Sequence, residues 1–424
     1  MARKDFKDIY AELDKQENFG DMRNTPYYED AVYSKFSNEE YERRYRLTRE
    51  KMARLGLDCL IVCGGPNHWS NGAGVTWLTG HREWHSLAVY VVVPMEGEPT
   101  LIYSMGGTHA EATRRKVYCK DVRPSRGGLF GEVMVERIKE LGLDKGRIGL
   151  TQVDPQFKDH MPINQYNTLR EGLPEAQFEI LGDYIHEFIL HKSLEEQAYV
   201  LKAGELAAKA IEAMAEVVKP GITEYELKAA AAFAILNGGG EVDFIIIGSC
   251  PMDEPALIFG NPRPSRRVIQ KGDYILNELA AGFEGYTVQI GMPICVGKPT
   301  RQIRTMFDKI VLPGFKHIAK ELMPGKTLAD IHRAAQFFRE HGYQSRPIIM
   351  HGIDLVSHPP SVTVEGYRGE DFGFELKPGR VMMLEPNPIT PDGQLGLFFG
   401  HTFLITEEGQ KRVTDRLPLE LIVV

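Results

Sequence analysis

A pattern that occurs twice in the second half of the chain limits the folds open to it. Two long helical stretches end at Pro220-Gly221 and at Pro324-Gly325, and each is followed by a shorter helical stretch that starts at Thr223 or Thr327. Proline and glycine end helices, and a threonine at the first position caps the next one. Ser193, which opens the first long stretch, begins the same kind of cap. The repeat therefore predicts two helix pairs.

Strand-like segments follow each predicted helix pair. They are Phe244–Gly248 and Tyr274–Met292 after the first pair, and Ile348–Asp354 and Val381–Ile405 after the second. We interpret this as an internal duplication of a helix–helix–strand unit, with two halves related by a pseudo-twofold axis and sheets that face one cleft. The alternative is two unrelated helix pairs that share a common Pro-Gly stop.

The first half alternates strands with helices. Expected strands are Asp58–Cys63, Ser86–Pro94, Pro99–Tyr103 and Arg147–Leu150, with helices over 39–55 and 131–141. Such alternation is typical of an α/β domain. We therefore expect a polar N-terminal extension over 1–40, an α/β domain over 41–190 and a second domain over 191–424. The fold class is α/β (α+β).

Composition excludes several classes of protein. The formal net charge of -8 argues against nucleic-acid binding. No apolar run reaches the length of a membrane span, and the first residues have no signal-peptide core. The five cysteines are scattered, and Cys59 and Cys63 lie in an apolar run, which favours buried thiols over a zinc or redox site. We expect a soluble cytoplasmic protein without a membrane partner.

Two polar residues interrupt the apolar strands around the turn at 283–285. Glu278 and Gln289 stand where a buried strand should be apolar. A strand that buries a carboxylate usually does so because a site needs it. These two residues therefore mark the candidate site.

Four segments of the second half carry a family resemblance in combination. They are Asn277-Glu278 with Tyr286-Thr-Val-Gln289, Met350-His351-Gly-Ile-Asp354-Leu-Val-Ser-His358-Pro, Lys377-Pro-Gly-Arg-Val-Met-Met-Leu-Glu385-Pro, and Thr402-Phe-Leu-Ile-Thr-Glu407. Here the chain resembles the pita-bread family, which includes methionine aminopeptidase, aminopeptidase P, prolidase, creatinase and ectoine hydrolase. The resemblance implies a creatinase-type N-terminal domain and a pita-bread catalytic domain.

The resemblance also bears on metal binding. Metallopeptidase members bind two metal ions through Asp, Asp, His, Glu and Glu, and the matching residues here are Glu278, Gln289, His351, Glu385 and Gly400. A bridged metal pair needs several carboxylates, and Gln289 and Gly400 supply none. We therefore expect no metal and no other cofactor. One weakly held metal on the remaining three ligands stays open.

Metal-independent members offer another mechanism. The catalytic histidine of creatinase corresponds to Gly260 here, whereas the glutamate segments of ectoine hydrolase resemble Asn277-Glu278-Leu and Leu384-Glu385-Pro. That resemblance implies Glu278 as nucleophile or base and Glu385 as its paired carboxylate, with His351 and His358 assisting. Two carboxylates in one cleft push their pKa values apart, so one can act as acid and the other as base.

Further residues are candidates for substrate binding. They are Tyr286, Gln289 and His401 in the second domain, and Arg82, Trp84 and His85 in the first. In creatinase the matching N-terminal loop reaches the active site of the second subunit, which implies a homodimer with shared active sites. The alternatives are core packing for Tyr286, a loop position for His358 and an exposed polar loop for residues 81–85.

The sequence thus predicts a metal-independent hydrolase that cleaves a C–N bond of amidine, guanidino, amide or hydrazide type in a small polar metabolite. Three alternatives remain. They are a lyase on the same scaffold, a metal-dependent Xaa-Pro peptidase and a non-catalytic binding module.

Overall fold

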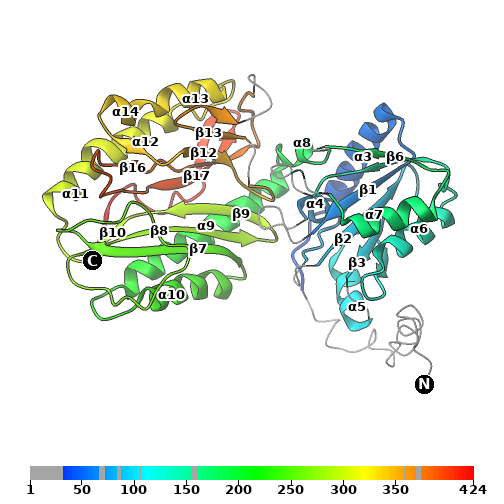
Figure 1. The fold of residues 1–424 in the computed structure, drawn as a ribbon, viewed down its shortest axis with the longest axis horizontal. Helices are drawn as coiled ribbons and strands as arrows, with labels where there is room; N and C mark the ends of the chain where they lie inside the picture. Colours follow the sequence, from blue (N-terminus) through cyan, green and yellow to red (C-terminus); the bar gives the residue numbers. More distant parts are fainter. Residues whose placement is uncertain are drawn as a thin grey trace. The chain divides into compact units, whose positions relative to one another are not determined.

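The computed structural model describes the chain over residues 32–65, 72–83, 87–104, 107–153, 158, 160–182, 184–357, 360–368 and 374–424 (Figure 1). The chain forms two compact units that divide between Ile189 and Leu190. No helix among the described residues is both long and apolar enough to cross a membrane.

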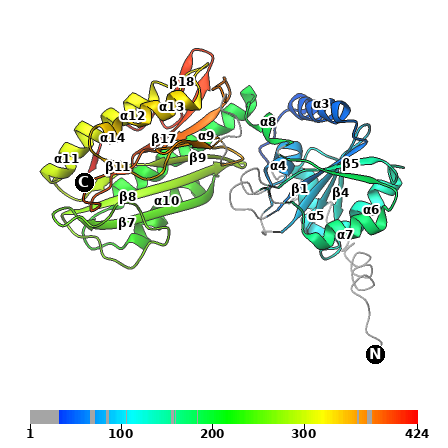
Figure 2. The same ribbon diagram turned by 45° about the horizontal axis from the view of Figure 1, so that its top comes forward.

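The N-terminal unit is built on a six-stranded mixed sheet with the order β4-β3-β2-β1-β5-β6. Its strands are β1 (Cys59–Gly64), β2 (Val89–Pro94), β3 (Thr100–Tyr103), β4 (Asp121–Pro124), β5 (Arg147–Leu150) and β6 (Gln177–Ile180). Its helices are α3 (Asn38–Leu55), α4 (Ala73–Thr79), α5 (Gly107–Lys116), α6 (Phe130–Glu140), α7 (Ile163–Gly172) and α8 (His186–Ile189). Figure 2 shows α3 on one side of this sheet and α6 and α7 on the other.

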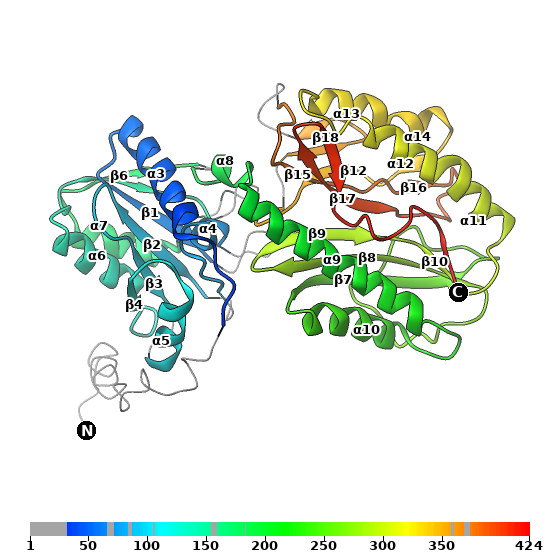
Figure 3. The same cartoon turned by 180° about the vertical axis from the view of Figure 1, so that it is seen from behind.

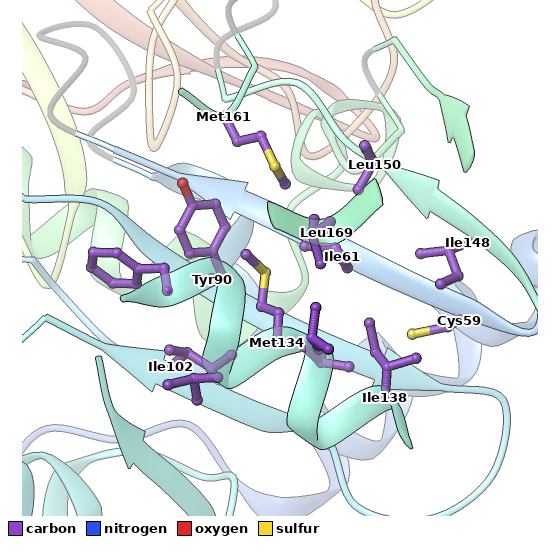
Figure 4. Packing of buried hydrophobic residues seen from close by; sticks show 14 of the residues in the cluster. Cys59, Ile61, Tyr90, Ile102, Met134, Ile138, Ile148, Leu150, Met161 and Leu169 are labelled. Carbon is purple, nitrogen blue, oxygen red and sulfur yellow. The ribbon is translucent and has the colours of Figure 1, made fainter. Parts of the chain in front are cut away.

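Both faces of the central strand β1 are covered, because its side chains alternate between them. Cys59, Ile61 and Cys63 pack with residues of α6 and α7 (Figure 4). On the opposite face, Val62 touches α4 so closely that a Cβ on Gly74 would crowd its methyl group. Burial raises the pKa of the Cys59 thiol to about 12, so this cysteine is an inert core residue.

The C-terminal unit contains an eleven-stranded sheet with the order β14-β13-β12-β15-β17-β9-β8-β10-β19, while β7 pairs with β8 and β18 with β17. The strands are β7 (Glu241–Pro251), β8 (Asp273–Phe283), β9 (Tyr286–Gly291), β10 (Ile294–Cys295), β12 (Ile348–Gly352), β13 (Ser361–Thr363), β14 (Tyr367–Arg368), β15 (Val381–Leu384), β17 (Gly400–Thr406), β18 (Gly409–Arg412) and β19 (Ile422–Val423). A separate pair joins β11 (Gln344–Ser345) to β16 (Pro388–Ile389).

Two sets of helices accompany this sheet, as the duplication predicts. The first is α9 (Leu194–Val217) and α10 (Glu224–Asn237), which lie across β7, β8 and β9 in Figure 3. The second is α11 (Arg301–Met306), α12 (Leu312–Ala319), α13 (Leu328–Ala335) and α14 (Phe337–Glu340). Capping boxes begin α9, α10 and α13 at Ser193, Thr223 and Thr327. The expected α/β class is confirmed.

One predicted helix differs from the structure. We expect a single helix over 300–322, whereas α11 and α12 are separated by a π-helical turn, Phe307–Val311. Pro313 stands in the first turn of α12. Proline has no N–H to give to the preceding turn, so the regular hydrogen-bond ladder stops there.

The β8–β9 hairpin carries two of the candidate site residues. Phe283 pairs with Tyr286, so the loop consists of Glu284 and Gly285 alone. Both loop residues have positive φ, 50° and 86°. This is the geometry of a tight hairpin turn that follows the twist of its strands, and it fixes the register of β8 against β9.

Candidate functional site

Four side chains from separate strands of the C-terminal unit meet in one buried group, which we call the carboxylate cluster. Glu278 comes from β8, Gln289 from β9 and His351 from β12, while Glu385 directly follows β15. All four are buried. The sheet places β9 next to β17, β17 next to β15 and β15 next to β12, which brings residues far apart in sequence together.

The amide of Gln289 joins the two carboxylates. Its Nε2 donates hydrogen bonds to Oε1 of Glu278 and to Oε2 of Glu385, the latter at 2.9 Å. The backbone of Gln289 is fixed as well, because its N–H donates to Oγ1 of Thr402 at 3.1 Å and its carbonyl accepts from the same hydroxyl at 2.8 Å. The amide that bridges the carboxylates is therefore held in place by β17.

His351 lies on the other side of Glu385. Its Nδ1 is 2.8 Å from the carbonyl oxygen of Gly352, and Nε2 is 3.5 Å from Oε1 of Glu385. A carbonyl only accepts hydrogen bonds, so Nδ1 carries the proton and donates it. This leaves Nε2 facing Glu385, in a position to exchange a proton with it or with a bound molecule.

The electrostatics of the cluster act on the carboxyl group of Glu278. Burial raises the pKa of Glu278 well above its usual range, and the charge of Glu385 raises it further. The charge of Arg346 and the hydrogen bond from Gln289 act in the opposite direction on the same pKa. Glu278 therefore holds a proton at a pH where an ordinary glutamate has lost it.

The donor set does not fit a pair of metal ions. The group between the two carboxylates is the neutral amide of Gln289, whose Nε2 donates to both of them, and it adds no negative charge to offset a pair of cations. At Gly400 an added Cβ would clash with the terminal methyl of Met383 and would lie 3.2 Å from Cβ of Glu385. Within the described part of the chain, no three His, Cys, Asp or Glu side chains are grouped to hold a metal ion.

His401 does not join the cluster. It follows Gly400 on β17, and alternate residues of a strand face opposite sides of a sheet. Its Nδ1 lies 2.7 Å from Oγ1 of Thr414, and its ring contacts Phe315 of α12 and Phe399. Burial, followed by the charge of Arg412, holds the pKa of His401 well below its usual range. The expected substrate-binding role has no support in this placement.

Tyr286 is also engaged elsewhere. Its hydroxyl donates to Oε1 of Glu196 at 2.8 Å, and its ring meets that of Tyr199 edge-on at 5.8 Å. Glu196 and Tyr199 belong to α9, so Tyr286 ties the start of β9 to this helix. A role in substrate binding remains a prediction.

The remaining predicted residues belong to the N-terminal unit or lie outside the described residues. Arg82 belongs to the N-terminal unit, where it is half-buried. Trp84, His85 and His358 lie outside the described residues. Their assignment to the site stays a prediction.

Sequence reasoning missed Arg346. It lies between β11 and β12, and its charge acts on Glu278. The only local signal is its place five residues before His351 in the chain. Its approach to Glu278 depends on long-range strand order, which no local pattern records.

Comparisons with known proteins agree on both units. Residues 198–407 match the Metallopeptidase family M24, and residues 43–187 match the Creatinase/Prolidase N-terminal domain. The chain is 30% identical over 261 residues to the Xaa-Pro dipeptidase of Pyrococcus furiosus, which covers 60% of this chain and 71% of that protein. It is 23% identical over 413 residues to the ectoine hydrolase of Halomonas elongata, which covers 92% and 98%.

Solved structures show the same fold. The X-Pro aminopeptidase from Thermotoga maritima superposes with a TM-score of 0.74 at 21% identity, over 90% of this chain and 99% of that one. The prolidase from Pyrococcus horikoshii gives 0.70 at 23% identity, over 88% and 98%. The expected pita-bread architecture is confirmed.

The predicted activity needs correction. We expect a metal-independent hydrolase of non-peptide C–N bonds, close to amidinohydrolases and ectoine hydrolase, and this expectation is wrong. Two of the similar proteins are Xaa-Pro dipeptidases of Pyrococcus species, and two of the similar solved structures are prolidases. The prediction failed because it gave the replaced ligand positions more weight than the shared scaffold. From these matches, the chain belongs to metallopeptidase family M24 and carries the N-terminal domain of creatinases and prolidases.

Proposed function

We propose that this protein hydrolyses the peptide bond of small Xaa-Pro-type peptides at the carboxylate cluster. Family membership and the Xaa-Pro dipeptidases among its relatives support the reaction class. The observation that carries the proposal is the bridge from the Gln289 amide to both Glu278 and Glu385. It holds two carboxyl groups in the close contact that paired acid–base chemistry requires.

The two carboxyl groups take different parts in the reaction. Glu385 accepts a proton from water as the water oxygen bonds to the carbonyl carbon of the substrate. Glu278, whose pKa is raised, donates its proton to the leaving nitrogen as the C–N bond breaks. Proton exchange with solvent then returns the pair to its starting state. Because the donor set does not fit a metal pair, the chain's own residues supply both the acid and the base.

His351 assists Glu385 rather than replacing it. Its ring is oriented by the Gly352 carbonyl, and Nε2 is 3.5 Å from Oε1 of Glu385. The imidazole provides a donor for an oxygen that gains charge on the substrate carbonyl.

Replacing each carboxyl group by its amide tests the proposal. Glu278→Gln removes the acid and Glu385→Gln removes the base, so each should lower kcat on an Xaa-Pro dipeptide by about 10²–10⁴-fold. The exposed Glu254 offers a matched control, and Glu254→Gln should hydrolyse the dipeptide like the unmodified protein. Release of free proline is the measurement. Full activity in both cluster variants would rule the proposal out.

A second candidate function is binding of such peptides without turnover. Gln289 and the space-limited Gly400 favour it, because both replace groups that ligate metal in peptidase relatives. Saturable binding by calorimetry, with no proline released during prolonged incubation, would select this function over hydrolysis.

Two further proposals concern how the chain associates and where it is located in the cell. We propose a homodimer because of the resemblance to creatinase. We propose a cytoplasmic location because the five cysteines are scattered along the chain. Sedimentation of the full chain as a monomer at micromolar concentration would contradict the dimer.

A further inference from the structure

Arg346 is a cation whose charge acts on the cluster, and among the described residues no carboxylate forms an ion pair with it. It lies between β11 and β12, and its backbone N–H donates to the carbonyl of Asn387 at 3.2 Å. Across the described chain, its guanidinium has no hydrogen-bond or ion-pair partner. Its central carbon instead lies 3.6 Å from the centre of the Phe259 ring. Stacking on an aromatic face holds the guanidinium in place and leaves its edge N–H groups available to bind an anion.

Packing connects this stacked arginine to the strands of the cluster. Phe259 meets Phe398 edge-on, with ring centres 5.2 Å apart. Phe398 in turn lies so close to Gly291 that a Cβ there would clash with its ring and with the carbonyl of Asn277. Gly291 follows Gln289 by two positions on β9, and Asn277 directly precedes Glu278 on β8.

The segment under Arg346 is anchored from a second side. Nδ2 of Asn387 donates to the carbonyl of Ile258 at 3.0 Å, next to Phe259. Asn387 is itself fully buried and lies two residues after Glu385. One residue therefore holds both the backbone of Arg346 and the loop that carries its aromatic support. The charge of Arg346 reaches the cluster, because it lowers the pKa of Glu278.

We infer that Arg346 is a specificity-determining residue that binds a free carboxylate of the substrate. A planar guanidinium matches a carboxylate with two parallel N–H···O bonds, and no described carboxylate lies within hydrogen-bond or ion-pair distance of it. The protein therefore selects small substrates with an unblocked carboxylate over amidated or extended ones. This inference rests on the proposed function, since it assigns part of the peptide substrate to Arg346.

Binding of proline and prolinamide tests the inference without requiring turnover. Proline, the product that retains the carboxylate, should bind the unmodified protein about 10- to 100-fold more tightly than prolinamide. Arg346→Gln should lose that preference. Arg346→Lys should keep part of it, because lysine retains the charge but not the planar fork. Arg333→Gln, which changes an exposed arginine paired with Asp330, is the matched control and should keep the full preference.

The outcomes separate this inference from the proposed function. Hydrolysis of an Xaa-Pro dipeptide and of its C-terminal amide at equal kcat/KM, unchanged in Arg346→Gln, would overturn the inference and leave the function standing. Carboxylate-selective binding that is lost in Arg346→Gln, without any hydrolysis by the unmodified protein, would overturn the function and support the inference. Thermal melting of each variant shows whether a lost preference reflects misfolding. If Arg346→Gln is misfolded, Arg346→Lys is the test: a partly retained preference for proline over prolinamide supports the inference, and an unchanged preference contradicts it.

Discussion

At the scale of single residues, two substitutions distinguish the carboxylate cluster from a metal centre. Gln289 puts a hydrogen-bond donor between Glu278 and Glu385, and Gly400 contributes no side chain where Met383 and Glu385 are close. A donor between two carboxylates does part of what a cation does there, since it lowers their repulsion. It does so without supplying positive charge to polarise a substrate.

Restoring acidic ligands should restore affinity for a divalent cation. Gln289→Asp combined with Gly400→Glu returns two carboxylates to the cluster, and the flexible Met383 side chain can move aside. We expect Mn²⁺ to bind this variant at least about tenfold more tightly than the unmodified protein, by calorimetry. Gln289→Asn with Gly400→Gln has similar volume without the charge. Equal affinity in both variants would contradict the charge argument.

His401 makes stability depend on pH. Its folded pKa is depressed, whereas the unfolded chain takes up the proton near pH 6.5. Its contribution to the free energy of unfolding is therefore complete above about pH 6.5 and falls below it by up to about 1.4 kcal/mol per pH unit. His401→Gln keeps a hydrogen bond to Thr414 but cannot titrate. Urea unfolding from pH 5 to 8 should show a flatter profile for this variant, and parallel profiles would contradict the assignment.

At the scale of elements, the β8–β9 hairpin sets the spacing between Glu278 and Gln289. Ala280 pairs with Gln289, and the two-residue turn leaves no room to shift this register. A slip of one residue would move Gln289 to the other face of the sheet. The placement of the amide therefore depends on the turn as much as on the strands.

Gly285→Ala tests the turn. Gly285 has a φ of 86°, a conformation that costs an L-residue roughly 1–2 kcal/mol. We expect the free energy of unfolding of Gly285→Ala to fall by about that amount. If the proposed hydrolysis takes place at the cluster, kcat should fall as well, even at temperatures where the variant is fully folded. Gly366, which has open space around it and no positive φ, is the matched control. Gly366→Ala should leave the stability unchanged or slightly higher.

Local chemistry explains which elements the sequence could predict. The caps at Ser193, Thr223 and Thr327 are formed as expected, because capping depends on residues within one turn. The break before α12 was overlooked, although Pro313 is visible in the sequence. The opposite facing of Gly400 and His401 was missed, because both were assigned to the site although neighbouring strand residues face opposite sides. Arg346 on Phe259 could not be predicted, since they lie 87 positions apart in sequence and tertiary packing alone joins them.

At the scale of the whole molecule, a buried ion pair joins two segments of the C-terminal unit that lie far apart in sequence. Nζ of Lys192, just before α9, contacts Oδ2 of Asp354, which follows β12 and His351. Both side chains are almost fully buried, and Asp354 also accepts from the N–H of Val356 at 2.9 Å. This ion pair fixes the segment that follows His351 in the chain.

Breaking the pair should be costly. Lys192→Met or Asp354→Leu leaves one buried partner uncompensated, which lowers the free energy of unfolding by about 3–5 kcal/mol. The double variant Lys192→Met, Asp354→Leu should lose clearly less than the sum of the single losses. Chemical denaturation of the unmodified protein, the two single variants and the double variant gives the four free energies of this double-mutant cycle. Additive losses would show that the two side chains do not interact in solution.

The bridge through Gln289 also crosses the boundary of the duplication. Glu278 and Gln289 come from the half that begins with α9, whereas His351 and Glu385 come from the half that begins with α11. Neither half contains all four residues, so the proposed catalysis requires that the two halves associate. A cut within the connection 296–300 would therefore yield two inactive fragments whose recombination could be followed by the return of proline release.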